Sequence, residues 1–350
     1  MPESRALRFT ESQSLAISSV RVIATLMIII CHIFQGYNHF LAWWFNIGVQ
    51  IFLFMSGFLL AHSDYSNKHH FLKKRLQRIL VPYWLLLLVA LPVYYFVGNG
   101  LNIKINEIPF YLTGTRGIYI GVRGIEHLWF LAVIVICYIF AVHISDLREA
   151  SRNIKAGSFY LYLCLSFLGL QWLENVRLLT PSYAPWVATF ILGYFLSYRY
   201  QGKFSKKLFY PLSLLALSTS GLRVYYENFA YVNRLPNNYV PWSKFLLGSF
   251  LFVALYLLFQ KLDWSKRPRL TKTLKFLDSY SFETYLTHQI FILGPFSFLY
   301  YTSSKPVNLL IISLLIITST LLLKFLSNLV YSKLLNKNKS NFKSRETLSQ

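Results

Sequence analysis

The sequence predicts an all-α fold: a polytopic transmembrane bundle of about ten helices with both termini in the cytoplasm. The chain of 350 residues is 55% hydrophobic and only 14% charged, whereas a soluble domain carries about 25% charged residues. Its apolar runs approach the ~20 residues that a helix needs to cross about 30 Å of hydrocarbon. This composition excludes an ordinary soluble two-domain protein, and also a disordered chain, which would need low hydrophobicity.

Apolar length and flanking charge define each predicted span in turn. The ten spans are 14–36, 43–62, 79–97, 126–144, 157–174, 183–199, 208–224, 244–261, 279–301 and 306–332. Together they form one membrane domain, 1–335, followed by a basic cytoplasmic tail, 336–350, that we expect to be disordered. The glycine-rich connection 98–125 is the longest, and we expect a flexible outer loop there.

The distribution of positive charge supports this topology. If both termini share one side, the segments on that side carry 25 of the 35 Lys and Arg residues, and the opposite side carries eight. Cytoplasmic loops of membrane proteins carry such an excess of Lys and Arg. The net charge of +22 is therefore explained by topology, and no nucleic-acid partner is predicted.

Arg21 and His32 are the first candidate site residues, because charged and polar groups in lipid are expensive and most often functional. Eleven residues of helix turn through about 1100°, so the two side chains share one face, roughly 16 Å apart. The alternative is that Arg21 snorkels to water and His32 is a packing residue.

The segment 69–79 is basic and is predicted to be cytoplasmic. As a helix it brings Arg75 and Arg78 to one side, next to Lys74. Arg forks match phosphate geometry, so this block is either a phosphate clamp for a cytoplasmic ligand or an anchor for anionic lipid headgroups. In the second span, Ser56-Gly57 allows a close helix contact or a local kink, and the default interpretation is packing.

Two further segments each place a carboxylate near an imidazole in the sequence. Glu126 and His127 stand at the outer end of the fourth span, where such a pair suits acid–base chemistry. In the ninth span, Tyr285 and His288 share a face, and we expect Glu283 to pair with His288. A structural hydrogen bond between helices is the alternative. We find no metal-ligand spacing, phosphate-binding glycine loop or serine elbow, so no metal or tightly bound cofactor is predicted.

With these residues in this order, the sequence resembles the acyltransferase 3 family of bacterial integral membrane O-acyltransferases, which acylate surface glycans. The matching features are Arg21 and His32; Gly48-Val49 with 54–59; Phe71, Lys74-Arg75, Arg78-Ile79 and 82–84; 127–131; and, more weakly, 279–281 with Tyr285-Leu286 and His288. Gln289-Ile290 stands where the family often has a proline.

The resemblance implies a donor, an acceptor and a role for each residue. The donor is cytoplasmic acyl-CoA, usually acetyl-CoA, and the acceptor is a hydroxyl of a cell-surface or lipid-linked glycan at the bacterial cell membrane. His32 is the general base or takes the acyl group covalently, and Arg21 positions the donor. Glu126 and His127 orient His32 or hold the acceptor, whereas Ser56, Tyr285 and His288 are second-tier site residues. The acyl-CoA would be bound by Lys74, Arg75, Arg78 and Trp84.

A glycan exporter or flippase is the main alternative from another class. Such a protein would also have about ten helices, a basic cytoplasmic face and buried His and Glu residues. It has no need of a site for CoA phosphates, so the joint presence of Arg21, His32 and the basic block favours the enzyme. A membrane sensor without catalytic activity is a more distant alternative.

Overall fold

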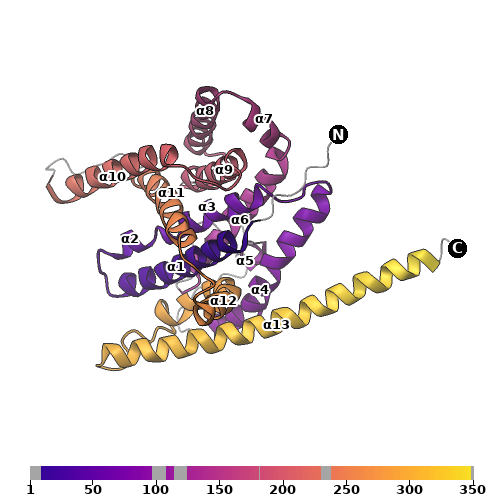
Figure 1. The fold of residues 1–350 in the computed structure, drawn as a ribbon. Coiled ribbons are helices and arrows are strands. Elements are labelled where there is room, and N and C mark those ends of the chain that lie inside the picture. Colours follow the sequence, from indigo (N-terminus) through magenta and orange to yellow (C-terminus); the bar gives the residue numbers. More distant parts are fainter. Residues whose placement is uncertain (1–8, 97–107, 114–123, 181, 230–237, 348–350) are drawn as a thin grey trace. The chain divides into compact units, whose positions relative to one another are not determined.

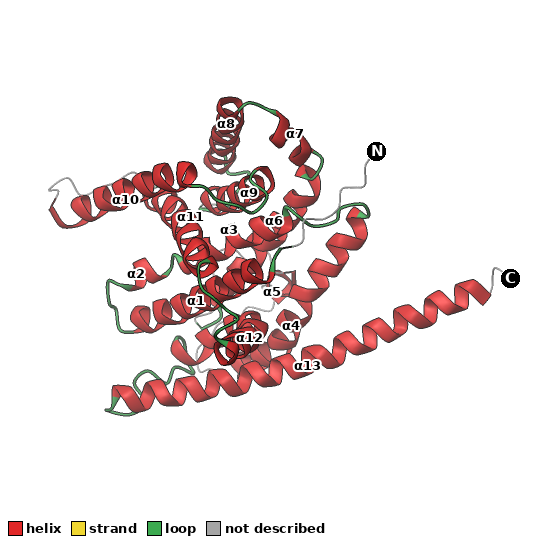
Figure 2. Cartoon of the chain, viewed as in Figure 1, coloured by secondary structure: helices red, strands yellow, loops and turns green. Residues whose placement is uncertain are grey.

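The computed structural model describes residues 9–96, 108–113, 124–180, 182–229 and 238–347. The secondary structure of these residues is helical, with loops and turns between the helices and no strand (Figures 1 and 2). The predicted all-α class is thus confirmed. Most of the predicted outer loop 98–125 lies outside the described residues, although a short helix, α5 (Ile108–Thr113), forms within it.

Each predicted span coincides with a helix. Seven of these helices in the described part of the chain are long and apolar enough to cross a membrane; α9, with 17 residues, and α10 and α12 are not among them. Ten crossings and cytoplasmic termini therefore stay predictions. The helices that match the spans are α1 (Glu11–Gly36), α2 (Ala42–Phe45) with α3 (Gly48–Leu60), α4 (Lys68–Phe96), η2 (Glu126–Leu128) with α6 (Trp129–Ile144), α8 (Ala156–Asn175), α9 (Tyr183–Arg199), α10 (Lys206–Phe229), α11 (Tyr239–Gln260), α12 (Pro268–Ile292) and α13 (Lys305–Thr347).

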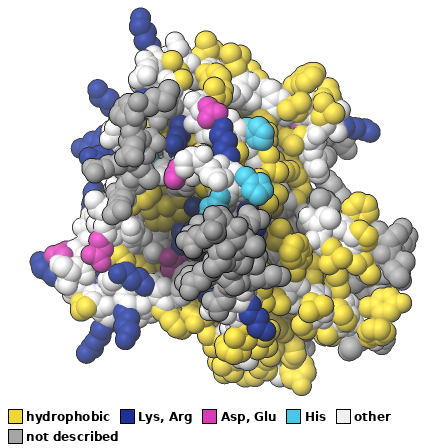
Figure 3. All heavy atoms as spheres, turned by 90° about the vertical axis from the view of Figure 1, so that its right-hand side faces the viewer, with side chains coloured by type: hydrophobic (Ala, Val, Ile, Leu, Met, Phe, Trp, Pro, Cys, Tyr) yellow, Lys and Arg dark blue, Asp and Glu magenta, His cyan; other side chains and the backbone are white. Residues whose placement is uncertain are grey.

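The helices extend past several predicted ends. Whereas a disordered tail was predicted from residue 336, α13 continues as a helix to Thr347. A further helix, α7 (Leu147–Asn153), lies in the predicted cytoplasmic loop between the fourth and fifth spans. Many large apolar side chains are exposed on the helices, such as Leu88 at 73% and Leu214 at 68%, and hydrophobic side chains cover much of the face in Figure 3. Outward-facing apolar side chains are what a lipid-exposed surface requires.

The chain divides into two compact units. Unit 1 comprises Met1–Lys73 and Phe130–Ser279, and unit 2 comprises Lys74–Trp129 and Tyr280–Gln350. Unit 1 thus holds α1 to α3, most of α6, α7 to α11 and the first half of α12. Most of α4, α5, η2, the second half of α12 and α13 belong to unit 2. Each unit is described by itself below.

The core of unit 1 is the contact between α3 and α9, and glycine makes that contact possible. A Cβ added at Gly57 would collide with the carbonyl oxygen of Phe190, and one added at Gly193 would collide with that of Phe54. The two backbones therefore touch, as small residues allow between membrane helices. The close contact predicted at Ser56-Gly57 is confirmed, and α9 is buried from Tyr183 to Tyr198 except at Trp186.

Two more glycines allow α1 and α11 to pack closely against α3. A Cβ at Gly48 would stand 2.7 Å from the Ala24 carbonyl oxygen of α1, and one at Gly248 of α11 would collide with Gln50. Helix α3 is thus held against α1, α9 and α11 by backbone approach. Because α1 carries Arg21 and His32, the glycine at position 48 helps to set the position of both side chains.

Arg148 binds backbone carbonyl oxygens just beyond the C-terminal end of α3. Arg148 donates to the carbonyl oxygens of Ala61 and Ser63 at 3.1 and 2.9 Å, just after α3 ends, where carbonyls lack helical partners. His62 in this turn accepts or donates a hydrogen bond with Ser197 at 2.9 Å.

Alanine substitution at the glycines of the core tests the close approach. Gly57→Ala and Gly193→Ala should each lower the free energy of unfolding by at least the ~1–3 kcal/mol of an overpacked core, because backbone atoms must shift. Gly169→Ala on α8 is the matched control: no atom lies within 4 Å of its added Cβ, and it should stabilise the helix by about 0.5–1 kcal/mol. Thermal unfolding in detergent measures all three variants. Equal midpoints for Gly193→Ala and Gly169→Ala would contradict the contact.

Candidate active site

Helix α1 presents the first two candidate residues. A capping box begins the helix: Thr10 accepts from the Gln13 backbone N–H, and the Gln13 side chain accepts from that of Thr10. This arrangement satisfies two N-terminal donors. From there α1 runs for 26 residues without a break, as the predicted alignment of Arg21 and His32 on one face requires.

Arg21 is held by an acidic partner that the sequence analysis missed. Its Nη1 lies 2.6 Å from Oδ1 of Asp278 on α12, within unit 1. Ser18 donates to the other carboxylate oxygen of Asp278 at 2.7 Å. The ion pair is only partly exposed, with 29% of the Arg21 side chain and 16% of the Asp278 side chain accessible. Arg21 therefore has a fixed orientation, and part of its charge is offset by Asp278.

His32 lies one helical turn from a second residue that the analysis missed. Its Nδ1 is 3.0 Å from Oε1 of Gln35. With that oxygen as the acceptor, the proton is on Nδ1 and the basic lone pair is on Nε2. The signal for Gln35 was present in the sequence, since residues three apart are neighbours on a helix. A tautomer fixed in this way suits a general base.

His127, in unit 2, has very different surroundings. The tight turn before it depends on Gly124, whose φ is 99° and whose added Cβ would lie 2.7 Å from the Leu293 carbonyl oxygen. The buried His127 ring then has Nδ1 2.5 Å from Gln289 Oε1 and Nε2 3.2 Å from the Leu286 carbonyl oxygen. Gln289 Oε1 also accepts from the His127 backbone N–H at 3.0 Å, which fixes the orientation of the amide. Both ring nitrogens thus lie within hydrogen-bond distance of an acceptor oxygen, and the imidazole donates to at least one of them.

Tyr285 and His288 of α12 both contact His127, a meeting that the sequence analysis did not predict. The Tyr285 hydroxyl donates to the His127 carbonyl oxygen at 2.5 Å, and the His127 and His288 ring centroids are 4.9 Å apart. All three residues are at most 5% exposed. They form, with Gln289, a buried polar cluster that ties η2 to α12 within unit 2.

The predicted pair of Glu283 with His288 is wrong. Glu283 Oε1 lies 3.1 Å from Nζ of Lys324 on α13, and Nδ1 of His288 lies 2.7 Å from the Tyr285 carbonyl oxygen. The physical reason is helical spacing: five residues turn through about 500°, which leaves the two side chains roughly 140° apart. Lys324 lies within the predicted span 306–332, and an isolated Lys in lipid requires a partner.

The basic block forms the first part of α4 in unit 2. Lys74 and Arg78 are exposed, and Arg75 is partly buried. The Tyr331 hydroxyl of α13 donates to the Arg78 carbonyl oxygen at 3.0 Å, which anchors this turn through its backbone.

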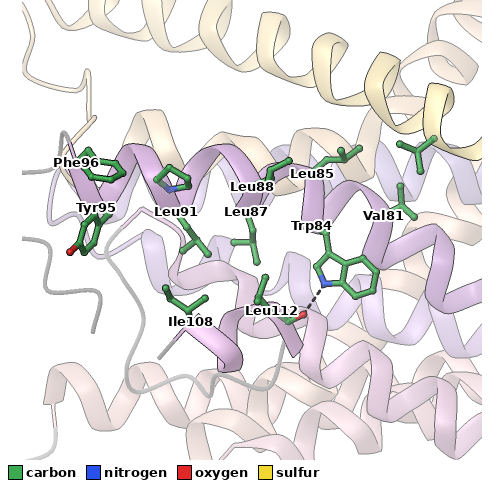
Figure 4. Close-up of a pocket in the computed structure, with 12 residues that line it drawn as sticks. Val81, Trp84, Leu85, Leu87, Leu88, Leu91, Tyr95, Phe96, Ile108 and Leu112 are labelled. Carbon is green, nitrogen blue, oxygen red and sulfur yellow. Dashed lines mark hydrogen bonds between the residues drawn. The ribbon is translucent and has the colours of Figure 1, made fainter. Parts of the chain in front are cut away.

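An apolar cavity of about 690 Å³ begins one turn beyond Arg78. Trp84, Leu87 and Leu91 point from α4 toward α5 (Figure 4). Trp84, predicted to bind acyl-CoA, also donates from Nε1 to the Leu112 carbonyl oxygen at 2.7 Å. The lining residues are Val81, Trp84, Leu85, Leu87, Leu88, Leu91, Pro92, Tyr95, Phe96, Ile108, Leu112 and Val330.

The candidate residues divide between the units. Arg21, His32 and Ser56 belong to unit 1, whereas Lys74, Arg75, Arg78, Glu126 and His127 belong to unit 2. Glu126 stands at the start of η2 and is partly buried. Among the described residues, no group of three or more His, Cys, Asp or Glu side chains is placed to hold a metal ion. The candidate residues themselves offer imidazole, guanidinium and carboxylate groups.

The long apolar helices define a multi-pass membrane protein. The comparison with protein families then gives the class of chemistry: the model of the acyltransferase domain of the acyltransferase 3 family matches residues 15–328. The chain belongs to this family, and it is a membrane acyltransferase. No curated protein and no solved structure matches the chain.

Gln289 provides a test of the buried cluster. Gln289→Leu removes the acceptor of two His127 groups, and a buried donor left unsatisfied costs about 1–3 kcal/mol, so the variant should unfold at a lower temperature in detergent. Gln289→Glu keeps an acceptor and should restore much of the loss. The control is Gln260→Leu at the end of α11, a partly exposed position. If Gln289→Leu and Gln260→Leu unfold alike, His127 does not depend on Gln289.

Proposed function

We propose that this acyltransferase moves an acyl group, acetyl in the simplest case, from cytoplasmic acyl-CoA to a hydroxyl of a cell-surface or lipid-linked glycan. The setting is the bacterial cell membrane. The observation that carries the proposal is the environment of His32. Its Nδ1 is engaged by Gln35, and it shares a helix face with an arginine held by Asp278.

The chemistry follows from that environment. Nε2 of His32 takes the proton of the acceptor hydroxyl as its oxygen attacks the thioester carbonyl carbon. The carbon–sulfur bond breaks, CoA leaves as a thiolate, and the proton passes to the thiolate to regenerate neutral imidazole. Covalent transfer through an acyl-histidine is the alternative route, because the same lone pair is also a nucleophile. Arg21 helps to position the donor.

Helix α4 supports acyl-CoA as the donor. A CoA thioester has phosphates at one end and an acyl group at the other, and α4 has basic side chains followed by an apolar cavity in the same order. From Arg78 to Val81 the separation along the axis is about 4.5 Å. The phosphates would be bound by Lys74, Arg75 and Arg78, and the apolar part of the donor would enter the cavity beside Trp84.

His32→Ala tests the general base. A general base contributes typically 10²–10⁴-fold to a rate, so acyl transfer by the purified variant in liposomes should fall by about that factor. His32→Gln should also fail, because an amide does not take a proton at neutral pH. Protein level and thermal stability should change little, since Ala is easier to place in lipid than His.

His143→Ala on α6 is the matched control, because His143 is also a helical histidine and is exposed. It should keep full transfer. Turnover of His32→Gln near that of the wild type would remove His32 from the role of base. Absence of acyl transfer in the wild type would instead favour an exporter or flippase, for which Gln at this position would be partly tolerated.

The donor site is tested at the two arginines of α4. Arg75→Ala and Arg78→Ala should each weaken acyl-CoA affinity by about 1.5–3 kcal/mol, as expected for hydrogen bonds to a charged group. Lys should rescue only partly, since it lacks the guanidinium fork. Arg269→Ala, at an exposed position of α12, is the control. Normal donor affinity in both Ala variants, with intact folding, would make the basic block a topology anchor only.

A further inference from the structure

Two cations of unit 1 that the proposed mechanism does not use are buried against tryptophans. Arg223 of α10 is 4% exposed and Lys244 of α11 is 7% exposed. The Arg223 Cζ lies 5.0 Å from the ring centroid of Trp44, and the Lys244 Nζ lies 5.1 Å from that of Trp43. Cations this close to an aromatic face are attracted by its quadrupole. We call these four residues the Trp–cation cluster.

Burial separates this cluster from an ordinary interfacial belt. Long basic side chains at a membrane surface extend toward water. Lys244 and Arg223 are instead enclosed within unit 1 by neighbouring side chains. Enclosed cations in a membrane protein are expensive and most often functional, so the cluster requires an explanation beyond anchoring.

The cluster lies beside His32. Cys31, which precedes His32 on α1, donates from Sγ to the Ala42 carbonyl oxygen at 3.1 Å, and Ala42 precedes Trp43. A chain of contacts therefore leads from the last turns of α1 to Trp43 and on to Lys244, all within unit 1.

Trp43 has the surface that a sugar ring requires. The residue is 60% exposed, so a large part of its indole is accessible although Lys244 lies over the ring. A pyranose presents a flat face of C–H groups that packs on such a surface. An acid group on the same sugar, at the edge of the indole, would be attracted by the Lys244 ammonium, whose Nζ is 5.1 Å from the ring centroid.

From this geometry we infer that the Trp–cation cluster binds an anionic saccharide, with the sugar ring on Trp43 and its carboxylate or phosphate at Lys244. The role of this saccharide as the acyl acceptor rests on the proposed function; the binding itself does not. An acidic acceptor held here would have its hydroxyl groups near the turn of α1 that carries His32. The site thus assigns a charge to the acceptor, which family membership leaves open.

Saccharide binding to the purified protein in phosphatidylcholine nanodiscs, without acyl-CoA, tests the inference by calorimetry. The probes are trigalacturonate with its carboxyl-reduced neutral form, and mannose 6-phosphate with mannose. At least one acidic probe should bind about tenfold or more tightly than its neutral partner, as a charge-assisted hydrogen bond predicts. The probe that binds distinguishes carboxylate from phosphate. This preference should weaken at high salt, a measurement that needs no variant.

Variants then locate the site. Lys244→Gln and Trp43→Ala should each weaken binding of the acidic probe about tenfold, and Lys244→Arg should retain most of it. The controls are Trp172→Ala, since Trp172 is 61% exposed on α8, and Lys305→Gln at the exposed start of α13. Both should bind like the wild type.

Two outcomes would overturn the inference. One is equal binding of each acidic probe and its neutral partner to the wild type, or acidic binding that Lys244→Gln leaves intact. The other is loss of saccharide binding when phosphatidylglycerol is added to the nanodiscs, which would identify the cluster as a lipid headgroup site. Failure of acyl transfer with intact acidic binding would overturn the proposed function and leave this site in place.

Discussion

Direct backbone contact between α3 and its neighbours is the constraint on which unit 1 depends. Lipid removes the hydrophobic drive for helices to associate, so close packing must supply the attraction. Gly57 and Gly193 let α3 and α9 touch, and Gly48 seats α3 against α1. Helix α1 carries Arg21 and His32. The glycine contacts that position α1 therefore also position His32, the proposed base. Gly248 likewise allows α11, the helix that carries Lys244, to pack closely against α3.

The predicted spans coincide with helices because apolar length and flanking charge are local properties of a sequence. Their ends shift where a helix continues beyond its apolar part. Helix α4 begins at Lys68, eleven residues before the predicted span, because the basic block is itself helical. Helix α12 begins at Pro268 and ends at Ile292, short of the predicted end at 301, and Gly294 with φ 87° follows. The partner of Gly57 was not predictable, since nothing near Gly193 in the sequence indicates which distant helix it meets.

The candidate site residues, like the spans, could be found from local features of the sequence, but their distant partners could not. Placing Arg21 and His32 in a membrane helix implies that they have polar partners, but the partner of Arg21 lies 257 positions away at Asp278. Asp278 also fell one residue outside the predicted ninth span, so its burial was not considered. The predicted partner of Glu283 was wrong. Nearness in sequence suggested His288, but helical geometry places these two side chains on different faces. The ion-pair partner of Glu283 is Lys324.

The structure separates two histidines that the motifs treat alike. A general base must keep one lone pair directed at its substrate, and a structural histidine satisfies both ring nitrogens within the protein. The His127 ring is held within the protein, because Gln289 Oε1 and the Leu286 carbonyl oxygen lie beside its two nitrogens and at least one nitrogen donates. In His32, Gln35 engages Nδ1, and the basic lone pair then belongs to Nε2. For this reason we propose His32 of α1, rather than His127, as the base, and the contact of Cys31 with Ala42 places it next to Trp43 and Lys244 of unit 1.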